Sequence, residues 1–132
     1  MRALFSRNRQ RMWPPDFGDS SFMRSVSPQE TASAGESLKR LIAGVGHRGI
    51  FSAEFKRDPR DGEFRLIEVN VRAWACVEFT TSCGVNTPWM SYRDALGWPV
   101  RDLGEYRIGR AGGVLAKDYR SFLAMRRQGR LG

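Results

Sequence analysis

The stretch EFKRDPRDGEFRLIEVNVR, residues 54–72, has the pattern of a β-hairpin. Two runs that alternate in character flank the segment DPRDG, which is rich in residues that favour turns. The second run carries Glu68, Asn70 and Arg72 at alternate positions, where a buried strand would carry valine or leucine. The presence of three polar side chains on one face of this strand therefore suggests a functional role for them.

Side chains alternate between the two faces of a strand. One face of the second run is therefore expected to carry Phe64, Leu66, Glu68, Asn70 and Arg72, and the other Ile67, Val69 and Val71. Both faces are partly apolar, which predicts a sheet covered on both sides. Turn length sets the register, so Glu54 is expected to pair with Leu66 or with Glu68. In either register, Glu54 shares a face with Glu68 and Asn70.

Two carboxylates that face each other across a sheet repel and are costly to desolvate. A bound divalent cation would offset this repulsion, because Mg²⁺ is coordinated by one or two carboxylates and completes its coordination shell with water and phosphate oxygens. Arg72 could bind an anionic oxygen through its planar guanidinium group. Together these residues predict a phosphoryl-transfer site. The alternative is an exposed sheet face on which the same polar groups only meet water.

The rest of the chain predicts helices and short strands. Residues 27–46 form the clearest helix, with Ser27 as N-cap, Glu30 completing a capping box, and an apolar stripe of Leu38, Leu41, Ile42 and Val45. The other expected elements are a strand within 2–13, an ordered loop at 14–25, strands at 49–57 and 63–73, and helices at 74–83, 86–97 (capped by Thr87) and 118–129. This order predicts an α+β fold, a small antiparallel sheet with flanking helices.

Length and composition narrow the class of protein. A chain of 132 residues suits one domain. It contains no apolar run of the roughly 20 residues that cross a bilayer, so no membrane partner is expected. The formal net charge of +8 is compatible with nucleotides, nucleic acid or an acidic protein surface. Cys76 and Cys83 are too far apart on a helix for a disulfide, and His47 is the lone histidine, so a reduced cytoplasmic protein without structural zinc is expected.

Residues 49–74, GIFSAEFKRDPRDGEFRLIEVNVRAW, resemble the C-terminal metal-binding hairpin of the ATP-grasp superfamily, with its first acidic ligand and its later E-x-N-x-R element. RQRMWPPDFGDSSF, residues 9–22, is similar to the strand and loop that precede the family's helix, and CGVNTPWMSYRDALG, residues 83–97, to the segment that follows the hairpin. GVLAKDYRSFLAMRRQGRL, residues 113–131, looks like the tail of the carboxylate–amine ligase-like and carbamoyl-phosphate-synthetase-like branches.

The resemblance implies a role for each polar residue of the hairpin. Glu54 and Glu68 would hold Mg²⁺ or Mn²⁺, with Glu68 bridging two ions, and Asn70 would be a further ligand. Arg72 would contact the transferred phosphoryl group or the attacking carboxylate. Enzymes of the family use ATP to convert a carboxylate into an acyl-phosphate, from which an amine, thiol or other nucleophile displaces phosphate. ATP and a carboxylate substrate are therefore the implied partners.

The chain lacks parts that the family has elsewhere. A lid subdomain supplies the family's phosphate-binding lysine and glycine-rich loop, and nothing in this sequence matches them. Residues 1–132 are therefore expected to be a partial ATP-grasp domain, a fragment inactive alone, with the lid in cis or in trans. Apolar surface left uncovered by the lid would promote self-association.

The alternative function is a non-catalytic basic module that binds nucleic acid or a protein partner. The segment RALFSRNRQRMW, residues 2–13, interleaves arginine with aromatic residues, as single-strand binders do. Arginines whose aliphatic stems lie along a ligase surface explain the same segment more simply, so nucleic acid is not the expected partner.

Overall fold

The computed structural model describes residues 1–130. The chain divides into two compact units. Unit 1 comprises Met1–Phe5 and Ser27–Tyr106, and unit 2 comprises Ser6–Val26 and Arg107–Gly132. The described residues form two small antiparallel sheets and four α-helices, so the predicted α+β class is confirmed. None of these helices combines the length and the apolar character that crossing a membrane requires.

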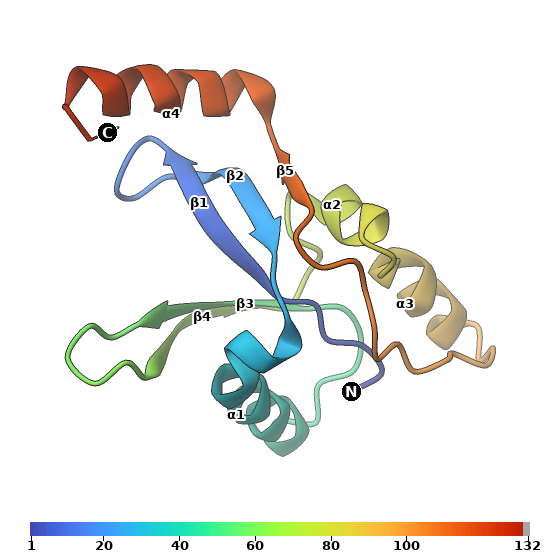
Figure 1. Ribbon diagram of the computed structural model, residues 1–132. Coiled ribbons are helices and arrows are strands. Elements are labelled where there is room, and N and C mark those ends of the chain that lie inside the picture. Colours follow the sequence, from blue (N-terminus) through green and yellow to red (C-terminus); the bar gives the residue numbers. More distant parts are fainter. Residues whose placement is uncertain (131–132) are drawn as a thin grey trace. The chain divides into compact units, whose positions relative to one another are not determined.

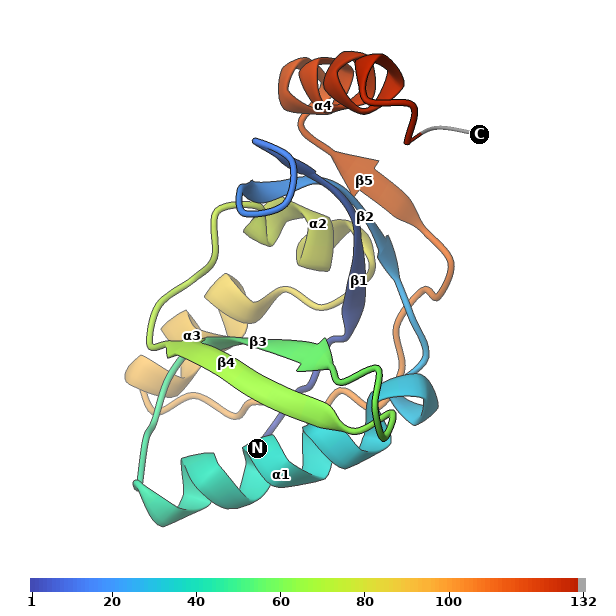
Figure 2. The ribbon, with the colours of Figure 1, turned by 90° about the vertical axis from the view of Figure 1, so that its left-hand side faces the viewer.

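Unit 1 contains one sheet of two strands and most of the helices. Its elements are the 3₁₀ turn η1 (Pro28–Thr31), α1 (Ala32–Gly44), β3 (Ser52–Arg57), β4 (Phe64–Asn70), α2 (Val77–Ser82) and α3 (Thr87–Ala95). Strands β3 and β4 form the predicted hairpin, and α1 packs against β4 (Figure 2). Phe79, Cys83 and Val85 are buried in this unit, and both cysteines are free thiols, as predicted.

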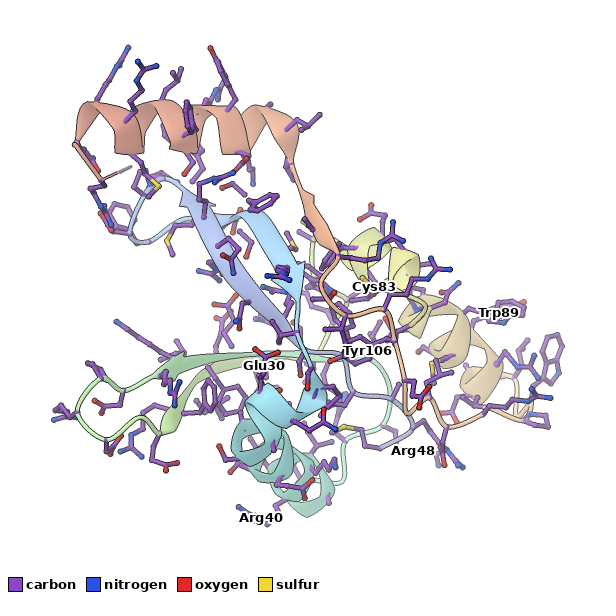
Figure 3. The ribbon with its side chains drawn as sticks, viewed as in Figure 1. Glu30, Arg40, Arg48, Cys83, Trp89 and Tyr106 are labelled. Carbon is purple, nitrogen blue, oxygen red and sulfur yellow. The ribbon has the colours of Figure 1, made fainter. Side chains whose placement is uncertain are left out.

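The start of the long helix follows the predicted capping box. The Ser27 hydroxyl oxygen accepts a hydrogen bond from the Gln29 amide at 3.1 Å, and the Ser27 amide donates to Oε1 of Glu30 at 3.1 Å. Figure 3 shows Glu30 at this end of the helix. The first turn is 3₁₀ and the α-helix begins at Ala32, so the cap is confirmed and the helix type differs only in its first turn.

The apolar stripe of α1 is narrower than the sequence predicts. Leu38 and Ile42 are buried, whereas Leu41 and Val45 are 40% and 66% exposed. A helix that rests on a single hairpin needs only one row of contacts, and the neighbouring row stays in water.

The cap of α3 differs from the prediction. Asn86, and not Thr87, is the N-cap, because the Asn86 side-chain oxygen accepts a hydrogen bond from the Trp89 amide at 3.0 Å. Thr87 is already the first helical residue. Asparagine is at least as good an N-cap as threonine, which explains the shift by one position.

Unit 2 is built from β1 (Arg7–Trp13), β2 (Asp19–Ser25), β5 (Ala111–Gly113) and α4 (Leu115–Arg127). The strands form an antiparallel sheet in the order β1-β2-β5, and α4 packs against β1 and β2 (Figure 1). Strand β1 lies within the segment predicted to be a strand, and α4 begins three residues before the predicted helix.

The prediction of a loop at residues 14–25 is wrong beyond Gly18, since β2 begins at Asp19. Ser21, Met23 and Ser25 point inward and are buried, so the strand does alternate. Two of its inward positions are serines, which conceal the apolar period of two that marks a strand. Burial is tolerated because the hydroxyls have partners, as when Ser25 donates to a backbone carbonyl at 2.8 Å.

Candidate metal and phosphate site on the β3–β4 hairpin

The turn that joins β3 to β4 is held by backbone and side-chain hydrogen bonds. The Asp58 amide donates to the Glu63 carbonyl and the Gly62 amide to the Asp58 carbonyl, both at 2.8 Å, and Gly62 has a φ of +77°. The Asp58 carboxylate accepts hydrogen bonds from Nε and Nη2 of Arg60 at 3.0 and 2.7 Å. This side-chain contact and a backbone hydrogen bond from Arg60 lower the pKa of Asp58 to about 2. The turn therefore fixes the register of the hairpin.

The register places the two acidic residues directly opposite each other. Glu54 pairs with Glu68, and Ser52 pairs with Asn70. This is one of the two registers that the sequence allows. Paired residues of an antiparallel ladder project from the same face, with Cβ atoms about 5 Å apart. The prediction that Glu54, Glu68 and Asn70 share a face is therefore confirmed.

A β-bulge changes the rest of that face. The pairing shifts by one residue at Ile67, which has no residue opposite it. An unpaired residue reverses the alternation beyond it. Phe64 and Leu66 therefore lie on the face opposite Glu68, and the prediction that they share its face is wrong. With the bulge included, the paired positions on one face of the hairpin are all polar: Ser52, Glu54, Lys56, Arg65, Glu68 and Asn70.

The apolar side chains of the hairpin are less covered than predicted. Leu66 and Ile67 are 42% and 61% exposed, and Val71, just beyond β4, is 68% exposed. A sheet covered on both sides would bury these side chains, so that prediction is wrong. Ile67 is the unpaired residue of the bulge and Val71 follows the end of β4, so neither lies within the paired ladder.

Within the polar face, the acid and the amide are in contact. Nδ2 of Asn70 donates a hydrogen bond to Oε1 of Glu68 at 2.7 Å. Glu68 is exposed, whereas Glu54 and Asn70 are half-buried. In residues 1–130 no three side chains of histidine, cysteine, aspartate or glutamate gather in a group that could hold a metal ion. The polar face instead offers two carboxylates and one amide, all with hard oxygen donors.

Arg72 does not lie on this face. Strand β4 ends at Asn70, opposite Ser52, which is the first residue of β3. Without a partner strand the chain bends, and the exposed Arg72 donates from Nη1 to the Ala73 carbonyl at 3.2 Å. The predicted strand was therefore too long at this end, and Arg72 belongs to the loop that follows the hairpin.

Two cations on the polar face, Lys56 and Arg65, were missed from the sequence. Arg65 contacts the turn, where it forms ion pairs with Asp58 at 3.7 Å and with Asp61. Both cations lie across the bulge from Glu68, so simple alternation assigns Arg65 to the wrong face. The adjacent apolar pair of Leu66 and Ile67 was the available signal, because two such residues in succession interrupt a period of two.

A separate pocket of about 460 Å³ lies beside α3. It is lined by Gly84, Asn86, Trp89, Met90, Arg93, Pro99, Val100, Arg101 and Leu103, and by none of the predicted hairpin residues. Trp89 is 47% exposed, stacks on Tyr92 with ring centroids 5.6 Å apart, and projects outward from α3 (Figure 3). This aromatic surface is distinct from the polar face of the hairpin.

Part of the chain is similar to a known ligase. No family model matches the chain. A stretch of 61 residues, 46% of the chain, is 30% identical to the D-aspartate ligase of Enterococcus faecium (strain Aus0004). The aligned part spans 14% of the length of that ligase. The chain is thus similar to a ligase over less than half of its own length.

Proposed function

We propose that this chain contributes the metal-binding and phosphate-binding hairpin of an ATP-dependent carboxylate ligase of the ATP-grasp type. The observation that carries the proposal is the direct opposition of Glu54 and Glu68, with the Asn70 amide in contact with Glu68. The E-x-N-x-R resemblance and the partial similarity to a ligase support the same reaction class.

The donor set on the polar face fits Mg²⁺ or Mn²⁺. Opposed carboxylates destabilise a hairpin unless a positive charge lies between them. Glu54, Glu68 and Asn70 would hold the cation through oxygen atoms, and their incomplete burial leaves room for water and for phosphate oxygens in the remaining positions. The cation would neutralise phosphate charge as a phosphoryl group leaves ATP for the substrate carboxylate.

The cations around the hairpin complete the electrostatics of the proposed site. Arg72, in the loop just beyond β4, would bind a phosphoryl or carboxylate oxygen through its guanidinium group. Lys56 and Arg65, on the same polar face as the acids, would add positive charge near the phosphates. An amine or a similar nucleophile would then displace phosphate from the activated carboxylate.

A lid domain, in cis or in trans, would supply the phosphate-binding lysine and the glycine-rich loop. The chain by itself is then expected to bind the divalent cation weakly and to catalyse no ligation. The exposed Leu66, Ile67 and Val71 are candidates for the surface that the lid covers, and for self-association in its absence.

A Mn²⁺ titration followed by electron paramagnetic resonance tests the proposal. The full chain should bind Mn²⁺, and Glu68→Ala or Asn70→Ala should weaken that binding at least tenfold. Glu63→Ala is the matched control, because Glu63 is an exposed carboxylate in the turn of the same hairpin and is not part of the polar face. Equal Mn²⁺ affinity in all four proteins would rule the proposed site out.

A further inference from the structure

The net positive charge of the protein belongs entirely to one of its two units. Unit 2 contains eleven lysines and arginines against three aspartates and glutamates, whereas unit 1 contains eleven of each. The formal net charge of +8 is therefore the net charge of unit 2. Such a concentration on fewer than half of the residues creates a strong local field for an anionic partner.

All three acidic residues of unit 2 are already paired within it. The pairs are Arg11–Asp118 at 2.6 Å, Lys117–Asp19 at 3.0 Å and Arg130–Asp16 at 2.9 Å. No further carboxylate side chain in the unit is present to neutralise the remaining arginines. Unit 2 therefore keeps a net positive charge that its own carboxylate side chains do not neutralise.

Two polar side chains of helix α4, Asp118 and Ser121, form hydrogen bonds to the sheet of unit 2. Arg11 donates two hydrogen bonds to the Asp118 carboxylate, at 2.7 and 2.6 Å. The fully buried Ser121 donates to the Met12 carbonyl at 2.8 Å. The one acid of α4 thus faces inward.

The outward side of α4 is apolar and basic. Leu115, Tyr119 and Phe122 follow one another at helical spacings of four and three and are 88%, 64% and 39% exposed. Exposed arginines flank this row at Arg120, Arg126 and Arg127. We call these six residues the outer face of α4. Leu123, Ala124 and Met125 are half-buried, so α4 carries apolar side chains on its outer side in addition to those that are partly covered.

We propose that the outer face of α4 binds the surface of an anionic lipid bilayer. A helix in the interface inserts its apolar row at the boundary of headgroups and acyl chains, and its arginines lie at the lipid phosphates. Surface binding needs no spanning helix, so it is compatible with the lack of a membrane-crossing helix among the described residues. The inference is independent of the proposed ligase function.

The side chains of the outer face favour lipid over a polynucleotide. Single-stranded nucleic acid is bound by aromatic rings that stack on bases. Tyr119 and Phe122 carry rings, but the most exposed apolar residue of the face is Leu115, an aliphatic side chain that has no ring to stack. An aliphatic residue gains more from an acyl boundary than from a base.

Vesicle co-sedimentation of the full chain tests the inference. Vesicles of phosphatidylglycerol and phosphatidylcholine in equal amounts should bind the protein, and vesicles of phosphatidylcholine alone should not. Arg126→Gln/Arg127→Gln should weaken binding about 30-fold, since each basic residue near an anionic surface contributes about fivefold. Leu115→Ser/Tyr119→Ser should weaken it at least about tenfold through lost apolar insertion.

Matched controls come from unit 1. Arg40→Gln/Arg101→Gln removes the same charge, and Leu41→Ser/Val45→Ser removes a comparable exposed apolar row on α1. Both controls should change binding less than twofold. Circular dichroism verifies that each variant is folded, and because the changed α4 residues are exposed, none is expected to disturb the unit.

The proposal is overturned by either of two results. One is a lack of binding to the phosphatidylglycerol vesicles. The other is vesicle binding that Leu115→Ser/Tyr119→Ser leaves unchanged and that a single-stranded oligonucleotide displaces. This second result would assign the basic unit to nucleic acid instead.

Discussion

Replacing Glu68 by glutamine should stabilise the protein when no divalent cation is present and leave it less stable than the unchanged chain when the cation is added. Glu68 lies directly opposite Glu54, so the two carboxylates repel across the ladder. Glutamine removes the charge but keeps the oxygen that accepts the hydrogen bond from Asn70. The substitution therefore isolates the electrostatic contribution of the pair.

The expected free energies follow from the geometry of the pair. Like charges directly opposite each other cost about 0.5 kcal/mol at an exposed position such as that of Glu68. At a cation concentration ten times the dissociation constant, binding to the unchanged chain adds about 1.4 kcal/mol to its free energy of unfolding. If the variant binds the cation at least tenfold more weakly, the difference moves from about 0.5 kcal/mol in favour of the variant to about 0.5–0.9 kcal/mol against it.

Thermal unfolding with and without MnCl₂ measures this reversal. For a chain of this size, a change of 1 kcal/mol moves the midpoint by about 4 °C. Glu63→Gln serves as the control, because it removes a carboxylate from the turn and not from the polar face; its response to Mn²⁺ should equal that of the unchanged chain. If Mn²⁺ raises the midpoint of the Glu68→Gln variant as much as that of the unchanged chain, the opposed carboxylates do not hold the cation.

Three further predictions concern the scaffold. Asp118→Asn should lower the free energy of unfolding by about 2 kcal/mol and speed amide exchange in α4, because the half-buried carboxylate loses its charge-assisted bonds to Arg11; unchanged exchange in α4 would contradict this. The pKa of the Asp58 carboxyl is lowered to about 2 in the folded chain, compared with about 3.9 in the unfolded chain. The carboxylate therefore stabilises the fold fully above about pH 3.9, and this contribution is lost as the pH falls toward 2. The stability gap between the unchanged chain and Asp58→Asn, measured by urea unfolding, should therefore close over this range, and a constant gap would count against it. Gly44→Ala should raise the free energy of unfolding by up to about 1 kcal/mol, since the added Cβ meets nothing within 4 Å. Gly35→Ala should not raise it, because the added Cβ would come to 3.0 Å from a leucine side chain. An equal increase in both variants would show that this contact is unimportant.

Features set by neighbouring residues could be predicted from the sequence. The capping box of Ser27 and Glu30 depends on residues three apart, and the hairpin turn depends on a tolerated positive φ at Gly62. The shared face of Glu54 and Glu68 also followed, because both registers that the turn allows give it. Local geometry decides each of these features.

Features set by distant partners could not be predicted. Strand β2 was missed because its inward serines are polar, and their burial depends on hydrogen-bond partners far away in the sequence. The end of β4 before Arg72 depends on where β3 begins. Arginines are concentrated toward both ends of the sequence, but the union of these two segments in unit 2 could not be predicted, since eighty residues separate them.

The central claim is that the polar face of the hairpin binds a divalent cation, and paramagnetic broadening by Mn²⁺ locates the site directly. Substoichiometric Mn²⁺ added to the ¹⁵N-labelled chain should first broaden the amide resonances of residues 52–54 and 68–70, which carry the opposed pair and the Asn70 amide. The same addition to the Glu68→Ala variant should leave those resonances sharp. Broadening centred on the turn at residues 58–63, or spread evenly over the exposed acids, would contradict the account.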